Sequence, residues 1–304
     1  MNPSTERIHR FGRSQHLVGV VGQPAQGDAA APGIIVLNTG LVHRVGPFRM
    51  HVELTRRLNA LGYPTLRMDL STMGDSGASA EAMTREDQVR ADVRDAIELM
   101  RRETACTRFI LLGLCRGAQS AHVAASTETG IAGVVFLDGF IYRTLGFRIR
   151  HYLPRLFQLR RWSGFLRRKV RQATATDAEP VSFGSVYPPR AQVRDEIGDM
   201  LRRGLQLYFL YSGGIGEQFN HPRQFGECYG RAIARHPALR MEILAGTDHT
   251  YTLVCDRERM YRHVEAWLLA AFPTTAGAAA ENDAENDAEP AARRVAGSRQ
   301  EPGR

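Results

Sequence analysis

The sequence lacks the cysteine spacing of a metal or redox site. Its 304 residues include four cysteines, and no two of them form a C-x-x-C pair. They are Cys106, Cys115, Cys228 and Cys255. This pattern argues against a zinc ribbon, a redox dithiol or a disulfide scaffold, and it favours a reducing compartment. A Gly-x-Gly-x-x-Gly after a strand, a P-loop and metal-ligand spacings are also missing, so we expect neither cofactor nor metal.

Long apolar runs are missing as well. No stretch approaches the roughly 20 apolar residues that a membrane-spanning helix needs. Residues 1–13 are polar and lack the apolar centre of a secretory signal. We therefore expect a cytoplasmic protein without integral membrane association. With 43% hydrophobic and 24% charged residues, the composition is that of a globular protein.

Lysine is almost absent, and one segment has no acidic residue. Lys169 is the only lysine among 40 basic residues, and the formal net charge is +8. Residues 139–176 contain nine arginines, Lys169 and no Asp or Glu, so this segment alone exceeds the net charge of the chain. The positive charge is therefore local.

Strand and helix patterns alternate through most of the chain. Continuous apolar runs at 34–37 and 109–112 predict strands buried on both faces. Further strands are expected at 17–21, 65–70, 134–137, 205–211 and 239–244, and helices at 48–61, 85–102, 117–126, 223–235 and 256–272. The alternation predicts an α/β fold with a mainly parallel central sheet flanked by helices. The Pro/Gly/Ala-rich stretch 22–33 predicts a hairpin loop.

The same patterns divide the chain into parts. Residues 1–14 predict a flexible N-terminal arm, and residues 15–139 and 200–273 predict the α/β core. Between them, the Arg-rich segment 140–199 has interleaved Leu, Phe, Tyr and Trp, which predicts a helical cap. Residues 274–304 contain a tandem Glu-Asn-Asp-Ala repeat and few apolar residues, so they predict a disordered tail.

A Gly-x-Cys-x-Gly motif follows the strand expected at 109–112. The residues are Gly113-Leu114-Cys115-Arg116-Gly117, and a helix is expected to begin at once. In a nucleophile elbow, the two glycines allow a sharp turn that lifts the central side chain above the sheet. Cys115 is therefore the predicted nucleophile, because a helix N-terminus and a nearby imidazole both favour the thiolate. The alternative is a small buried cysteine after a core strand.

One histidine has the placement that an elbow requires. His249 lies in the loop between the last expected strand and the last helix, so it is the predicted proton shuttle. In the chain order nucleophile, acid, histidine, the acid follows the strand expected at 205–211, where Glu217 is the only carboxylate. Asp138, at the end of the preceding strand, is the alternative acid. Solvated loop side chains remain the alternative for His249 and Glu217.

Two backbone N–H groups are expected to form an oxyanion hole. One belongs to Arg116, directly after the predicted nucleophile. The other belongs to the loop that follows the strand at 34–37, where Leu41 is the first choice and Gly40 the second. Glycine at this position allows the backbone to approach the substrate closely, although a simple turn glycine is the alternative.

Residues 15–272 resemble the α/β-hydrolase superfamily, and most of all the bacterial exosortase A system-associated hydrolases. The resemblance rests on residues 44–49 (Arg-Val-Gly-Pro-Phe-Arg), 68–76 (Met-Asp-Leu-Ser-Thr-Met-Gly-Asp-Ser), 113–115, 140–144 (Phe-Ile-Tyr-Arg-Thr) and 248–250 (Asp-His-Thr). It implies an α/β-hydrolase fold, a cysteine in the elbow and a basic helical cap after the sixth strand, which ends at Leu137. The acid loop, which usually offers an Asp, here offers Ile215-Gly216-Glu217.

The insertion is expected to cover the active site. Its aromatic residues would line the substrate pocket, and those with this predicted role include Tyr142, Tyr152, Phe157 and Trp162. Its arginines either form a solvated face, dock an anionic acyl carrier protein or coenzyme A, or attach to an anionic membrane surface. No nucleic-acid recognition motif is present, so we expect no nucleic-acid partner.

Three functions are consistent with these residues. The first is hydrolysis of an ester or thioester through an acyl-cysteine, with a Cys-His-(Glu/Asp) triad. The second is acyl transfer from a carrier-bound thioester to an alcohol or amine, which would use the same intermediate if the cap excludes water. The third is a non-catalytic binding protein that uses the basic cap to hold a partner. The sequence does not indicate an oligomeric state.

Overall fold

A computed structural model of the chain describes residues 5–28, 30–156, 187–216 and 218–279. Eight strands form one sheet in the order β1-β2-β4-β3-β5-β6-β7-β8. Their bounds are β1 Thr5–Phe11, β2 Leu17–Gln23, β3 Gly33–Val36, β4 Thr65–Asp69, β5 Phe109–Leu114, β6 Ile131–Leu137, β7 Gln206–Ser212 and β8 Leu239–Leu244. β2 pairs antiparallel with β1 and β4, and all pairs from β4 to β8 are parallel. The predicted, mainly parallel sheet is confirmed.

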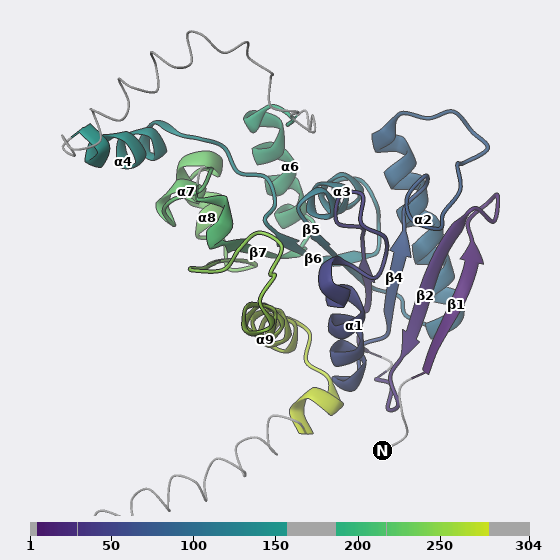
Figure 1. The fold of residues 1–304 in the computed structure, drawn as a ribbon. Helices are drawn as coiled ribbons and strands as arrows, with labels where there is room; N and C mark the ends of the chain where they lie inside the picture. The colour runs from purple at the N-terminus through teal and green to yellow at the C-terminus, as the bar shows by residue number, and fades with distance from the viewer. Residues whose placement is uncertain (1–4, 29, 157–186, 217, 280–304) are drawn as a thin grey trace, which may run out of the picture.

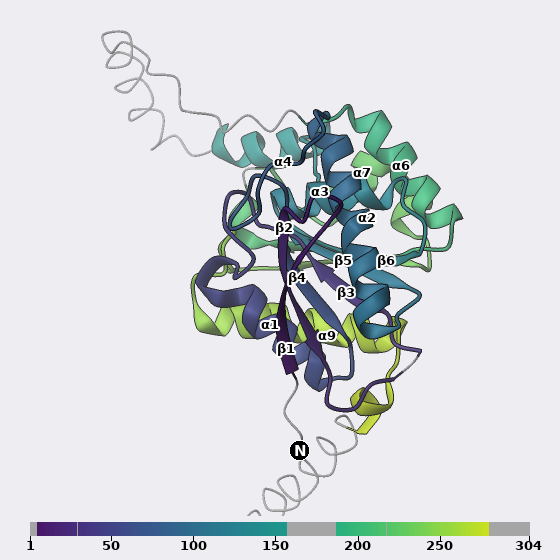
Figure 2. The ribbon, with the colours of Figure 1, turned by 90° about the vertical axis from the view of Figure 1, so that its right-hand side faces the viewer.

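Helices cover both faces of this sheet (Figure 1). Their bounds are α1 Met50–Ala60, α2 Arg85–Thr104, α3 Arg116–Ala125, α4 Leu145–Leu156, α6 Arg190–Arg202, α7 Arg223–Tyr229, α8 Arg231–Ala234 and α9 Val254–Ala271, with short 3₁₀ helices at Pro47–Arg49 (η1) and Gly213–Ile215 (η2). α1 and α9 pack on one face, and α2, α3 and α6 pack on the other, as Figure 2 shows. This arrangement brings all the connections that follow parallel strands to one edge, the carboxyl-terminal edge of the sheet.

The central strand β5 explains why the core is two-sided. Phe109 and Leu111 point into the apolar cluster beneath α2, α3 and α6, whereas Ile110, Leu112 and Leu114 point into the cluster beneath α1 and α9. Alternate side chains of a strand lie on opposite faces, so a strand buried on both faces needs an unbroken apolar run. The apolar run in the sequence therefore places β5 in the middle of the sheet.

The insertion begins at the end of β6. α4 and α6 are its described helices, and residues 157–186 lie outside the description. Thr144 and Arg150 both bond to Glu227, on α7, so the inner face of α4 is tied to the core. Phe147 is almost fully buried on that same face.

Two predictions at the N-terminal side of the sheet are wrong. The predicted arm, 1–14, contains β1, which pairs with β2 along its length. Phe11 is the only buried residue of this strand, and Glu6 bonds to Arg56 and Arg67, so backbone pairing and ion pairs stabilise a strand with little apolar signal. The stretch 22–33 is not a hairpin loop, because β2 pairs with β1 and β4 whereas β3 pairs with β4 and β5.

Two predictions near the C-terminus also need correction. The helix expected at 223–235 divides into α7 and α8 at Gly230, whose φ of 91° does not continue a helix. The predicted tail, 274–304, begins with an ordered helical turn at 275–279. Thr274 is buried and donates to the carbonyl of Leu61 at the end of α1, which anchors this turn. Residues 280–304 lie outside the description.

Candidate active site

Cys115 sits in a sharp turn between β5 and α3. Its φ is 57° and its ψ is −112°, and its N–H donates to the carbonyl of Leu137 (2.9 Å). A positive φ is unfavourable for a residue with a Cβ and persists only where the surroundings impose it. The thiol is partly buried, and α3 begins at the next residue, so the positive end of a helix dipole lies beside the sulfur.

The two glycines of the motif are needed for steric reasons. A Cβ on Gly113 would lie 2.1 Å from the carbonyl carbon of Gly117, and a Cβ on Gly117 would lie 2.6 Å from the carbonyl oxygen of Asn38. Backbone atoms cannot move away as the end of a flexible side chain can. The turn around Cys115 therefore depends on a glycine at both positions.

His249 lies between a carboxylate and the thiol. Its Nδ1 donates to Oδ2 of Asp138 (2.6 Å), and its side chain also hydrogen-bonds to Cys115. The hydrogen bond with Asp138, and then that with Cys115, raises the pKa of His249 from 6.5 to about 10, although burial opposes this shift. The imidazole is therefore positively charged at neutral pH.

Asp138 is the carboxylate that contacts the histidine. It directly follows β6 and has a φ of 49°, and 1% of its side chain is exposed. Ser212, at the end of β7, donates to Asp138 twice, from its N–H to Oδ1 (2.6 Å) and from its hydroxyl to Oδ2 (2.7 Å). Glu217, the first choice for the acid in the sequence analysis, lies outside the described residues.

These side chains open into one cavity of about 330 Å³. Its described lining is Cys115, Asp138, Gly139, Ile141, Tyr187, Gly214, Ile215, Gln218 and His249. A Cβ on Gly214 would lie 2.4 Å from the backbone nitrogen of His249, so a glycine there lets the loop after β7 pass beneath the histidine. The residues after β5, β6, β7 and β8 thus meet in a single pocket.

Tyr187 is a cavity residue that the sequence analysis missed. Burial, Cys115 and Asp138 raise its pKa, and its side chain hydrogen-bonds to Gln119 of α3. Its ring packs edge-on against Phe140 and Tyr142, with centroids 5.2 and 5.8 Å away. No motif surrounds Tyr187, because it precedes only a Pro-Pro pair in a segment without clear periodicity.

Of the four predicted cap residues, only Tyr142 has a described side chain, and it does not line this cavity. Tyr142 is turned toward the core, where its hydroxyl donates to the carbonyl of Pro188 (2.7 Å). Phe157, Trp162 and the side chain of Tyr152 lie outside the description. Aromatic composition could not distinguish Tyr142, which packs behind the cavity, from Tyr187, which faces it.

The loop predicted to form the oxyanion hole is held from beneath. Asn38 donates from Nδ2 to the carbonyl of Val42 (3.0 Å) and to Oδ1 of the buried Asp69 (2.9 Å), and it accepts from the N–H of Leu70 (2.6 Å). Asp69 also accepts from Arg44, through the backbone and the guanidinium. This network fixes both ends of the loop that contains Gly40 and Leu41, the two candidates for the second oxyanion donor.

The three predicted oxyanion residues lie at the same edge of the sheet. Gly40 has a φ of 57°, Leu41 is 74% exposed, and Arg116 is the first residue of α3. The close packing of Gly117 against Asn38 places this loop beside the start of α3. Their role as donors stays a prediction.

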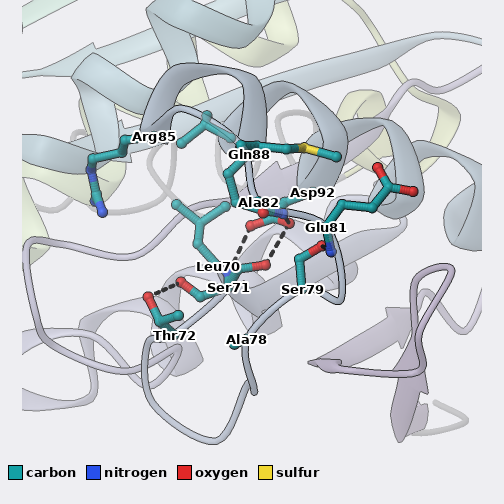
Figure 3. Close-up of a pocket in the computed structure, with 12 residues that line it drawn as sticks. Leu70, Ser71, Thr72, Ala78, Ser79, Glu81, Ala82, Arg85, Gln88 and Asp92 are labelled. Atoms are coloured by element: carbon teal, nitrogen blue, oxygen red, sulfur yellow. Dashed lines mark hydrogen bonds between the residues drawn. The ribbon is translucent and has the colours of Figure 1, made fainter.

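A second cavity, of about 320 Å³, lies between the end of β4 and the start of α2 (Figure 3). Asp92 lies beneath it, almost fully buried, and accepts from the N–H and the hydroxyl of Ser71, both at 2.7 Å. His16 contacts the same hydroxyl (3.0 Å). This cavity includes neither Cys115 nor His249, and its carboxylate serves to fix the turn after β4.

No group of three or more His, Cys, Asp or Glu side chains is placed to hold a metal ion in the part of the chain that the structure describes. Nor does any helix in these residues combine the length and the apolar character that crossing a membrane requires.

Solved structures with the same fold come from several bacteria and an archaeon. An esterase from Pyrococcus furiosus has 14% identity and a TM-score of 0.58, and the alignment covers 88% of this chain and 92% of that one. Est1E from Butyrivibrio proteoclasticus has 13% identity, a TM-score of 0.54 and coverages of 90% and 100%. An α/β serine hydrolase without a lid from Xanthomonas campestris has 14% identity, a TM-score of 0.52 and coverages of 90% and 98%.

No curated protein matches the sequence significantly. Residues 35–293, which make up most of the chain, match the model of the alpha/beta hydrolase family. The sheet order, the turn at Cys115 and the placement of His249 agree with this match. The chain therefore belongs to the alpha/beta hydrolase family.

Proposed function

We propose that this hydrolase cleaves an ester or thioester through an acyl intermediate on Cys115. The observation that carries the proposal is one continuous set of contacts, in which His249 hydrogen-bonds to Cys115 on one side and to the buried Asp138 on the other. Because the three side chains line one cavity, a carbonyl group that enters it meets the sulfur and the imidazole together.

The first half of the reaction forms the acyl-cysteine. The Cys115 thiolate attacks the carbonyl carbon, and the negative charge moves to the carbonyl oxygen. When the intermediate collapses, the carbon–oxygen or carbon–sulfur bond to the leaving group breaks. The imidazolium of His249 gives its proton to the departing alcohol or thiol, so neutral imidazole remains.

The second half returns the enzyme to its starting state. Neutral His249 takes a proton from a water molecule, which attacks the acyl-cysteine carbonyl. The bond between the acyl carbon and the Cys115 sulfur then breaks, and a carboxylic acid leaves. The released thiolate again faces a protonated imidazole, whose Nδ1 still donates to Asp138.

Asp138 is the acid in this proposal, in place of Glu217. Its carboxylate is almost fully buried and fixed by Ser212, so it holds the imidazole in one orientation and favours its charged form. The backbone N–H groups of Arg116 and Leu41 or Gly40 are proposed as the oxyanion donors, since both segments lie beside the turn. The network around Asn38 and Asp69 would keep the loop in place.

The resemblance to exosortase A system-associated hydrolases supports a cysteine in this role. The Xanthomonas relative is described as a serine hydrolase, whereas the elbow of this chain carries Cys115. A thiolate–imidazolium pair is already ionised before the substrate arrives, so it depends less on a general base than serine does. We therefore assign this chain to the cysteine variant of the mechanism.

The proposal is tested by turnover of activated short-chain esters and thioesters. Cys115→Ala is expected to lose turnover, and His249→Ala to slow it by about 10² to 10⁴-fold. Cys255→Ala is the matched control, because Cys255 is a free, exposed cysteine outside the cavity. Full activity in Cys115→Ala would refute the proposal, and no turnover by the wild type with any acyl donor would favour a binding protein.

Acyl transfer would use the same intermediate and is separated by its products. Added alcohols or amines compete with water for the acyl-cysteine, so the ratio of ester or amide to free acid measures the preference. A carrier-bound acyl donor, on acyl carrier protein or coenzyme A, belongs in the same assay beside a simple thioester. A rate advantage for the carrier-bound donor would support the carrier as partner.

A further inference from the structure

Exposed apolar side chains gather at one edge of the molecule. Among the described residues, ten large apolar side chains are exposed, and all except Ile8 lie in connections after the carboxyl ends of β3, β4, β6 and β8. These nine are Leu41, Val42, Phe48, Met83, Leu145, Ile149, Leu153, Leu253 and Val254. Cys115, Asp138 and His249 follow β5, β6 and β8 at the same edge. The edge that contains the catalytic cavity is therefore also the apolar one.

Three of the nine side chains form a line on α4. Leu145, Ile149 and Leu153 are 77%, 60% and 48% exposed, and their spacing of four residues places them on one helical face. The opposite face is occupied, since Phe147 is buried and Arg150 pairs with Glu227. The apolar line thus points away from the core, on a helix that lies beside α7 at the margin of the fold (Figure 1).

The charge next to this line is positive. Arg148 is exposed, directly precedes Ile149 and forms no ion pair with a described residue. Within α4 itself, Arg148, Arg150 and Arg155 are basic and no residue is acidic. The same edge also carries exposed acidic residues, but they lie after β4 and not after β6. Glu81 precedes α2, and Glu86 and Asp87 lie in its first turn. Positive charge therefore accompanies the apolar line of α4.

We propose that the outer face of α4 binds the surface of an anionic lipid membrane. A helix with exposed aliphatic side chains and arginines lies in the membrane interface with its apolar side chains among the acyl chains and its cations at the headgroups. A second copy of this chain fits less well, because a symmetric contact would bring two basic segments together.

This inference does not depend on the chemistry proposed for Cys115. It predicts where the protein binds, whereas the proposed function predicts what the cavity does. Cys115→Ala should therefore bind lipid like the wild type. A protein that cleaves esters but does not bind lipid would refute the membrane proposal alone. A protein that binds lipid but does not cleave esters or thioesters would refute the proposed function alone.

The test is co-sedimentation of the full chain with vesicles. One set contains phosphatidylcholine and phosphatidylglycerol, and the other contains phosphatidylcholine alone. The variant Leu145→Ser/Ile149→Ser/Leu153→Ser removes the apolar line from exposed positions, and Ile8→Ser removes an equally exposed aliphatic side chain from β1. Far-UV circular dichroism and thermal unfolding check that each variant is folded, independently of any turnover.

We expect the wild type and Ile8→Ser to bind the anionic vesicles and to bind the neutral ones more weakly. The affinity of the triple variant for the anionic vesicles should be lower than that of the wild type by about tenfold or more. Added salt should weaken binding of the wild type to the same vesicles. Equal binding by the triple variant and the wild type, or no binding by the wild type, would overturn the proposal. A dimer that dissociates in the triple variant would identify a second copy as the occupant and would also overturn it.

Discussion

Oδ2 of Asp138 lies 2.6 Å from Nδ1 of His249, although 111 positions separate the two residues in the sequence. The contact exists because β6 and β8 end at the same edge of the sheet, on either side of β7. Ser212, at the end of that middle strand, holds the carboxylate from the side. The histidine therefore rests on a carboxylate from β6 that the fold itself immobilises.

Replacing Asp138 should change both the charge and the activity of the site. In Asp138→Asn we expect the pKa of His249 to fall from about 10 toward its ordinary value, because its largest upward contribution is the hydrogen bond with this carboxylate. Turnover should fall by about 10²-fold or more. NMR titration of the imidazole and steady-state kinetics measure the two effects.

The matched comparison for this variant is Glu217→Gln. It should leave the His249 titration and the turnover unchanged, because Asp138 already occupies Nδ1 of the imidazole. If Glu217→Gln lowers both quantities and Asp138→Asn lowers neither, the acid follows β7, as the sequence order first suggested.

The raised pKa of His249 also predicts a pH dependence of stability. The folded protein binds this proton more tightly than the unfolded chain, whose histidine has a pKa near 6.5. The stabilisation is thus complete below about pH 6.5 and is lost as the pH rises through about 10. Denaturant unfolding of the wild type and His249→Ala should show a difference in free energy that shrinks over this range. A difference that stays constant to about pH 11 would contradict the assignment.

The elbow glycines should tolerate no side chain. Gly113→Ala and Gly117→Ala each force a Cβ into backbone atoms, so we expect a loss of about 3 kcal/mol or more in the free energy of unfolding, or failure to fold. Gly27→Ala is the control, since no atom lies within 4 Å of the added Cβ. Thermal unfolding compares Gly113→Ala, Gly117→Ala and Gly27→Ala with the wild type. A Gly113→Ala variant as stable as the wild type would contradict the claim that the turn around Cys115 requires this glycine.

The loop after β3 should depend on Asn38. Asn38→Ala removes the partner of the Leu70 N–H and of Asp69, which costs about 1–3 kcal/mol. Because oxyanion donors act mainly in the transition state, kcat should fall by about tenfold while KM changes little. A rise in KM at constant kcat would place the loop in substrate binding instead.

The sequence predicted the features that local chemistry determines. The strand–helix alternation, the elbow at Cys115 and the loop position of His249 each depend on residues that lie close together in the chain. The same reasoning could offer Glu217 and Asp138 only as alternatives, because the choice depends on which strand tip lies beneath the imidazole. That is a matter of three-dimensional geometry.

Other features carried no local signal. β1 has one buried residue, so its pairing with β2 leaves little apolar alternation to detect. Tyr187 and Tyr142 differ only in which side of the same aromatic cluster they occupy. The apolar line on α4 has the spacing of an ordinary helix face, and only the structure shows that Leu145, Ile149 and Leu153 are exposed whereas Phe147 is buried.

The most direct test of the central claim is to locate the acyl group by peptide mass spectrometry. The wild type, Cys115→Ala and Cys255→Ala are exposed briefly to an acyl thioester, acid-quenched and digested. We predict one acyl group on the peptide that contains Cys115 in the wild type and in Cys255→Ala, and none in Cys115→Ala. Equal acylation of Cys255 and Cys115, or a wild type that turns over substrate with no acylated peptide, would contradict the account.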